Sequence, residues 1–294
     1  LGDDKIDISS SGSGQIKNTS ENFSISTNVD LDYLVRSKNE DVIYLSDFEF
    51  NLNFSRDNNT LSFENLFGTA SATGTRMFIG SNFTNITADL IFNQDKLFYN
   101  LYGELEPDLK AEAEGTFEFS PYDQTFNLNT LWVDYKNIEW ENDEQIQVEF
   151  YTDSTHLSNL NLVNQDAVLT ASGYLLGDGN QNLTFGLSRL PGNIIDSYLL
   201  NSDTGNLESE ININSTIKGS LDYPIIDLEL NVNDVTVAGI DLGNLICNVD
   251  YSYSNLTTVL NFINSEYGIN DPLLEINGSF PIYLGFKQVE SRIS

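Results

Sequence analysis

Strict alternation of apolar and polar side chains is the feature that most limits how this chain can fold. In residues 48–54 every second side chain is apolar and its neighbours are polar. Such a period of two is typical of a β-strand that buries only one of its faces. The pattern predicts strands at 48–54, 117–119, 146–150, 183–187, 211–217, 228–232, 249–253 and 274–276.

The segments between these runs indicate how the strands connect. They are rich in turn residues, for example Asp57-Asn58-Asn59 and Asn270-Asp271-Pro272, and so predict a long antiparallel meander. Because each strand can bury one face only, the sheet must fold over on itself. A sandwich, a closed barrel and an open, folded-over sheet all meet this requirement. We expect at most one or two short helices, the best candidate being 191–200, where a loop with an apolar plug is the alternative.

Charge and composition restrict the partners. The chain has 294 residues, with 44 acidic and 13 basic side chains and a net charge of −31. This field repels phosphate backbones, so we expect no nucleic-acid partner. It also repels anionic headgroups, which favours a segment that stands off from a membrane surface, although the acidity could equally reflect habitat or solubility. One Cys and one His exclude a disulfide framework and a Cys/His zinc cluster.

No residue pattern points to catalysis, and we expect neither an enzyme nor a cofactor. His156 follows Asp153-Ser154-Thr155 in a segment that we interpret as a surface loop. The carboxylates around Glu139 and Glu141 are expected to form a solvated hairpin, because a functional pair needs an enclosing cleft. Asp178-Gly179-Asn180 begins like a calcium loop but lacks its later ligands, so we predict a hairpin turn.

Residues 1–294 are expected to form one continuous segment of a larger protein, with a soft boundary near Pro107. The small residues of 9–14 predict a flexible loop or hairpin tip. The C-terminal residues 281–286 are apolar and uncharged, and they lack the usual protection of an edge strand. We therefore expect end-to-end association through the terminal strands.

The second half of the chain carries a more specific pattern. A Gly-x-Leu-x-x-Pro step at 219–224 precedes alternating strands and the Leu242-Gly243 turn. Residues 274–282 repeat a strand that ends in Gly and is followed by Pro. This repeated sequence pattern resembles that of the TamB-like proteins in the AsmA-like superfamily. The resemblance is best over residues 100–290. The family, named for a translocation and assembly module, has no catalytic residues to transfer.

The resemblance implies a β-taco, an open trough that is apolar inside and polar outside. It also implies a periplasmic location in a diderm bacterium, as part of an inner-membrane-anchored protein with a role in lipid transport and outer-membrane biogenesis. Expected partners are phospholipid acyl chains, neighbouring segments of the same protein and an outer-membrane assembly barrel. The expected groove lining is Phe48, Phe50, Leu52, Phe54, Phe117, Phe119, Ile146, Val148, Phe150, Leu183, Phe185, Leu187, Ile211, Ile213, Leu228, Leu230, Val232, Val249, Tyr251, Leu274 and Ile276.

The alternation also predicts which substitutions would interrupt such a groove. A charge at Phe185 or Leu230 should block it, whereas the outward-facing change Asn231→Asp should be almost neutral. The main alternative function is an extracellular structural or adhesin-like β-sandwich, which would leave no open apolar seam. A carboxylate glycosidase is a weaker alternative, since Trp132 and Trp140 offer few platforms for sugar rings.

Overall fold

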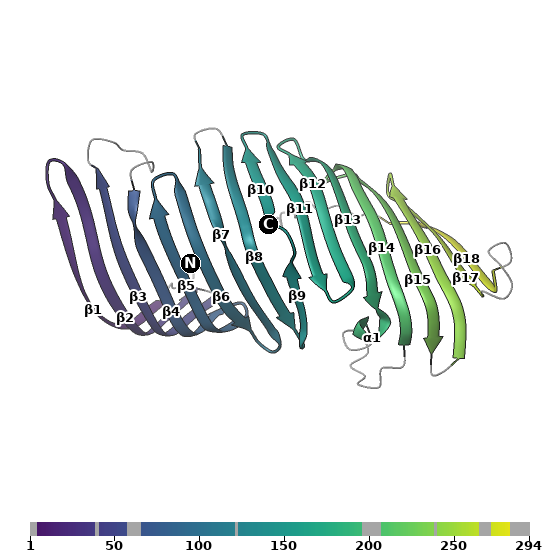
Figure 1. Cartoon of the computed structure of the whole chain (residues 1–294), viewed down its shortest axis with the longest axis horizontal. Helices are drawn as coiled ribbons and strands as arrows, with labels where there is room; N and C mark the ends of the chain where they lie inside the picture. Colours follow the sequence, from purple (N-terminus) through teal and green to yellow (C-terminus); the bar gives the residue numbers. More distant parts are fainter. Residues whose placement is uncertain are drawn as a thin grey trace, which may run out of the picture. The chain divides into compact units, whose positions relative to one another are not determined.

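The computed structural model describes residues 5–38, 41–57, 66–120, 123–195, 207–237, 240–264 and 272–282. Eighteen strands form a long antiparallel meander in this part of the chain (Figure 1), which confirms the predicted all-β class. The only helix among these residues is α1 (Gly192–Ile195). It occupies four residues of the expected 191–200 segment; Pro191 is the last residue of a strand, and residues 196–200 lie outside the described residues.

The chain divides into two compact units, Leu1–Glu149 and Phe150–Ser294. Pro107 lies in the turn between β6 and β7, inside the first unit. The strands of the first unit are β1 (Lys5–Asn18), β2 (Asn22–Lys38), β3 (Asp41–Asp57), β4 (Leu66–Ile79), β5 (Asn82–Asn93), β6 (Lys96–Leu105), β7 (Leu109–Phe119), β8 (Asp123–Tyr135) and β9 (Ile138–Asn142). β10 (Ile146–Tyr151) spans the division. The second unit contains β11 (Ser154–Asn164), β12 (Ala167–Leu176), β13 (Asn180–Pro191), β14 (Leu207–Ser220), β15 (Pro224–Val237), β16 (Ile240–Ser252), β17 (Asn255–Ile263) and β18 (Leu274–Pro281).

Seven of the eight predicted runs lie within a strand, and the eighth, 249–253, extends one residue beyond the end of β16 at Ser252. Most of these strands extend well beyond the predicted run. The prediction for 9–14 was wrong, because these residues are the middle of β1. Gly12 and Gly14 pair with Val29 and Thr27 of β2. A Cβ atom on Gly12 would come within 2.6 Å of the Asn28 carbonyl oxygen. The small residues therefore allow a close strand pair here and do not mark a flexible tip.

The strands of the first unit bend along their length. Figure 1 shows β1–β6 turning near the lower edge of the view. The pairing skips one residue on each of four successive strands, and these residues form a row: Asp32, Asp47, Thr75 and Asn85. Asp47 and Asn85 have left-handed backbone angles, φ 54° and φ 50°, which Asp and Asn tolerate better than most residues. Such irregularities bend and twist a strand.

Asparagine side chains support similar irregularities in both units. In the second unit, Asn212 and Asn244 accept hydrogen bonds from the backbone N–H groups of Arg189 and Asp234, each at 2.9 Å. Both Arg189 and Asp234 have positive φ, and each lies where the register shifts. Asn142 plays the corresponding role toward Leu131 in the first unit. These amides satisfy N–H groups that the regular ladder leaves without partners.

Candidate functional site

The apolar side chains of the second unit form continuous rows across its strands. A row here means residues that lie directly opposite one another on successive strands and therefore share a face of the sheet. Four such rows cross β13–β18, and all twelve residues predicted on these strands lie in them. One example is Leu187, Ile213, Leu230, Cys247, Leu260 and Ile276. We call the face that carries these rows the apolar face.

The first unit has a matching apolar face. Its five central rows start on β1 at Ile8, Ser10, Gly12, Gly14 and Ile16. Phe48, Phe50, Leu52 and Phe54 lie in four of them, and Phe117 shares the row of Phe54, Phe92 and Phe126.

Charged residues are excluded from this face. None occurs in the five central rows of the first unit or in the four rows of the second unit. Arg36 and Arg56 lie in the rows that flank the central ones of the first unit. The acidic side chains of the described strands therefore lie outside these rows, in a chain whose net charge is −31. The apolar face thus presents neither charge nor local repulsion to an anionic or zwitterionic amphiphile.

The predicted lining residues differ in how far they are covered. Buried members are Phe48, Ile146, Ile211, Val232 and Tyr251. Exposed members are Phe150, Phe185, Leu274 and Ile276. Half-buried members are Phe50, Leu52, Phe54, Phe117, Phe119, Val148, Leu183, Leu187, Ile213, Leu228, Leu230 and Val249. Most of the face is therefore covered only partly by its own neighbours.

In the first unit, aromatic rings lie against glycines on the next strand. Phe48 pairs with Gly74, Phe54 with Gly68, and Tyr99 with Gly115. In each case a Cβ atom on the glycine would collide with the ring. Tyr99 also stacks on Phe126, with ring centroids 5.2 Å apart, and donates a hydrogen bond of 2.9 Å to the Asn127 carbonyl oxygen. Burial raises the pKa of Tyr99 to about 12. These pairs cover backbone that would otherwise be open.

A hollow of about 230 Å³ opens in the apolar face of the first unit. Its sides come from Phe83, Leu101, Leu105 and Leu109. Its floor is formed by the small residues Gly103, Ala111 and Ala113, and a Cβ atom added to Gly103 would meet nothing within 4 Å. Tyr102 is the one lining residue with a polar side chain, and its hydroxyl donates to Glu104. The hollow can accept an apolar group without displacing a hydrogen-bonded partner.

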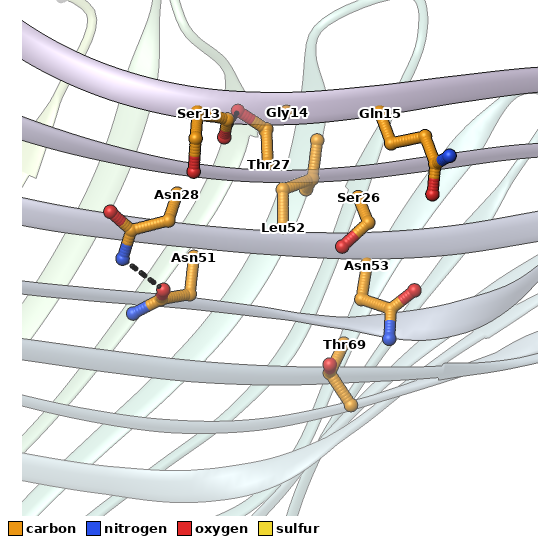
Figure 2. Close-up of a pocket in the computed structure, with 10 residues that line it drawn as sticks. All are labelled: Ser13, Gly14, Gln15, Ser26, Thr27, Asn28, Asn51, Leu52, Asn53 and Thr69. Atoms are coloured by element: carbon orange, nitrogen blue, oxygen red, sulfur yellow. Dashed lines mark hydrogen bonds between the residues drawn. The ribbon is translucent and has the colours of Figure 1, made fainter.

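The opposite, polar face is also hollowed. A hollow of about 490 Å³ lies over β1–β4 and is lined almost entirely by neutral amides and hydroxyls. Figure 2 shows the residues that line it. Asn28 donates to Asn51 at 2.7 Å within it (Figure 2). A second polar hollow of about 390 Å³ lies over β13–β16, where Asp227 and Asp250 are directly opposite each other. Sequence reasoning treated this face as plain solvated surface and missed both hollows. The Asn, Ser and Thr positions at 26–28 and 51–53 were the available signal for the first hollow.

The residues considered for catalysis belong to different strands and turns. His156 is in β11, opposite Tyr174 and between the rings of Tyr151 and Tyr174, so the loop interpretation was wrong. Its neighbours Thr155 and Leu157 pair with β12, and this pairing makes the segment a strand. Asp178 accepts hydrogen bonds from the backbone and side chain of Asn180, which lower its pKa, and the segment forms the predicted turn between β12 and β13.

Metal-binding clusters and membrane-spanning helices are both absent from the described residues. No group of three or more His, Cys, Asp or Glu side chains there is arranged to hold a metal ion. Among the same residues, no helix has the length and apolar character that crossing a membrane requires.

Comparison of the chain with protein-family models, with curated proteins and with solved structures found no match.

Proposed function

We propose that this chain binds the acyl chains of lipids along its apolar face and shields them from water. The observation that carries the proposal is that each unit has its own uncharged apolar rows, in which several side chains remain open to solvent. Leu101 is 41% exposed and Phe185 is 37% exposed in the middle of these rows. Seven of the large apolar side chains that are exposed in the described residues lie in these rows: Ile8, Ile16, Leu101, Phe185, Leu274, Ile276 and Phe280. Large exposed apolar surfaces are typical of binding sites.

Acyl chains suit such a face because they need burial and little directional bonding. Each methylene removed from water contributes about 0.8 kcal/mol. The 230 Å³ hollow between β5, β6 and β7 can take part of one chain. The headgroup can stay in water beside the face, so no charged pocket is required. The proposal assigns no catalytic step to the chain.

In its wider form the proposal places the chain in a TamB-like protein that moves lipid between the inner and outer membranes of a diderm bacterium. Two observations support this form: the repeated strand pattern of residues 219–282, and the bent, one-sided sheet of the first unit. An extracellular β-sandwich would use the same alternation, but it would bury the rows between two sheets. Phe50, Leu52 and Phe54 are only half-buried, which argues against the sandwich.

The single cysteine offers a direct test. Cys247 is half-buried in the apolar rows, and Asn248 beside it is exposed on the polar face. A small polarity-sensitive fluorophore on Cys247 should shift to the blue and saturate when lysophosphatidylcholine is added below its critical micelle concentration. The matched control carries Cys247→Ser and Asn248→Cys, and its fluorophore should respond much less.

Organic extraction of the purified protein followed by mass spectrometry should also recover phospholipid. If the protein is lipid-free and the two fluorophore positions respond equally, or neither responds, the proposal is wrong.

A further inference from the structure

One row of side chains on the polar face of the first unit is uncharged and has no internal partners. On β1–β4 this row consists of Gln15, Ser26, Asn53 and Thr69, which lie directly opposite one another. All four side chains are exposed and line the hollow of about 490 Å³ (Figure 2). Within the described part of the chain, none of these side chains donates or accepts a hydrogen bond. We call these four residues the neutral row.

The polar side chains around the neutral row differ from it. Asn28 donates to Asn51 at 2.7 Å, and Asn51 donates to Glu49 at 3.1 Å, so these amides are already engaged. The rows on either side carry charges, with Asp89 in one and Lys17 in the other. The neutral row therefore keeps its hydrogen-bonding groups for water or for a ligand.

Apolar side chains continue the neutral row on the next two strands. Ile91 of β5 lies opposite Thr69, and Phe98 of β6 lies opposite Ile91. They are 52% and 40% exposed, on a face where the alternation mostly places polar side chains. An exposed aromatic ring beside unpaired amides and hydroxyls is typical of a site for a ligand that has both apolar and hydroxyl groups.

We propose that the neutral row binds an extended, neutral oligosaccharide. The sugar hydroxyls bond to the four polar side chains, and the C–H face of one ring packs on Phe98. Neighbouring strands are about 4.8 Å apart, which is close to the length of one hexose unit in an extended chain. Each successive sugar therefore meets the side chain of the next strand. The site lies on the face opposite the proposed lipid surface and requires no lipid.

Other classes of ligand fit the neutral row less well. No Lys or Arg is among the described residues that line the hollow, and the net charge of −31 repels anions. No Asp or Glu is among these lining residues either, which disfavours a metal ion. An acyl chain would remove water from four unpaired polar groups without replacing their hydrogen bonds. A sugar hydroxyl both donates and accepts, as the amides and hydroxyls of the row do.

Isothermal titration calorimetry of the full chain with cellohexaose, a flat and uncharged β-(1→4)-linked hexasaccharide, tests the proposal. Because water competes for exposed hydrogen bonds, we expect a dissociation constant on the order of 0.1–1 mM. Asn53→Ala removes an amide from the middle of the neutral row, and Phe98→Ser removes the ring. Each change should weaken binding at least about fivefold. Both side chains are exposed, so circular dichroism should show that the variants remain folded.

Asn214→Ala and Tyr174→Ser are the matched controls. They remove an exposed amide and an exposed ring from the polar face of the second unit, and they should leave the affinity for cellohexaose unchanged. An uncharged Gly-Ser decapeptide should not bind. The proposal is overturned if cellohexaose does not bind, or if the controls weaken binding as much as the test variants. Equal affinity for the peptide would also overturn it, because the hollow would then accept any neutral polar chain.

Discussion

A carboxylate placed on an open part of the apolar face should weaken lipid binding strongly without unfolding the protein. Phe185 is the best position, because its cross-strand neighbours Ala171 and Ser215 are small and the ring is 37% exposed. A phenylalanine side chain presents about 200 Å² when fully accessible. The open fraction is therefore about 75 Å², and covering it with an acyl chain contributes about 2 kcal/mol at 25 cal/mol per Å².

Phe185→Asp removes this contribution and adds the cost of desolvating a carboxylate. We expect the apparent affinity for lysophosphatidylcholine to fall at least about 30-fold, since 1.4 kcal/mol corresponds to a factor of ten. The assay is the Cys247 fluorophore titration. Thr184→Asp is the control, because Thr184 is exposed on the polar face and pairs with Ser172 and Thr216. Equal losses in the two variants, with both folded by circular dichroism, would refute the assignment of the apolar face.

Three further predictions concern stability in urea. Gly115→Ala should lower the free energy of unfolding by about 3 kcal/mol, because the new Cβ atom collides with Tyr99 and with the Asn127 carbonyl. Gly103→Ala should be nearly neutral, because the space around Gly103 is open. Asn212→Ala should lower the free energy of unfolding by about 1 kcal/mol, because the Arg189 N–H loses its acceptor. Asn214 is exposed on the same strand, and Asn214→Ala should have a smaller effect. The raised pKa of Tyr99, about 12 against an ordinary 10.0, means that the unfolded chain loses this proton first as pH rises. Stability should therefore fall by on the order of 2 kcal/mol between pH 10 and 12, and Tyr99→Phe should lose less over the same range. Equal effects of test and control variants, or identical pH profiles, would contradict these assignments.

The alternation identified eight of the eighteen described strands, because it reports burial directly. All twelve lining residues predicted on β13–β18 fall on one face. The irregular positions were missed, although a signal for them exists. Ser46-Asp47 separates Leu45 from Phe48, and Asn233-Asp234 separates Val232 from Val235. Two polar residues in succession interrupt the period of two at these points. The extra residue keeps the apolar side chains on one face, so it marks a bulge within the strand.

The hydrogen-bond partners of polar side chains were harder to predict than the strands. Several of these bonds join residues two apart on the same face of one strand, which the alternation does not reveal. Asn231→Asp illustrates the difficulty. The sequence predicted a neutral outward change, but the Asn231 amide donates to Glu229 at 2.9 Å. An aspartate there would place two carboxylates side by side and remove the donor, so the change is unsuitable as a control. Asn51, Asn212 and Asn277 donate in the same way to Glu49, Glu210 and Glu275.

The same side chains must serve this protein both as a core and as the proposed lipid surface. A one-sided sheet has no second layer to separate these roles, so exposure along each row decides which role dominates. Phe48 is 6% exposed and lies against Gly74, which makes it a packing residue whose loss would destabilise the sheet before any ligand arrives. Phe185 contributes less to packing because its neighbours are small, and more of its ring remains available. A ligand that covers the open rows also stabilises the fold, by the free energy of its binding to the native state alone. Lipid affinity and resistance to unfolding are therefore coupled through the apolar face, and only substitutions at its open positions can separate them.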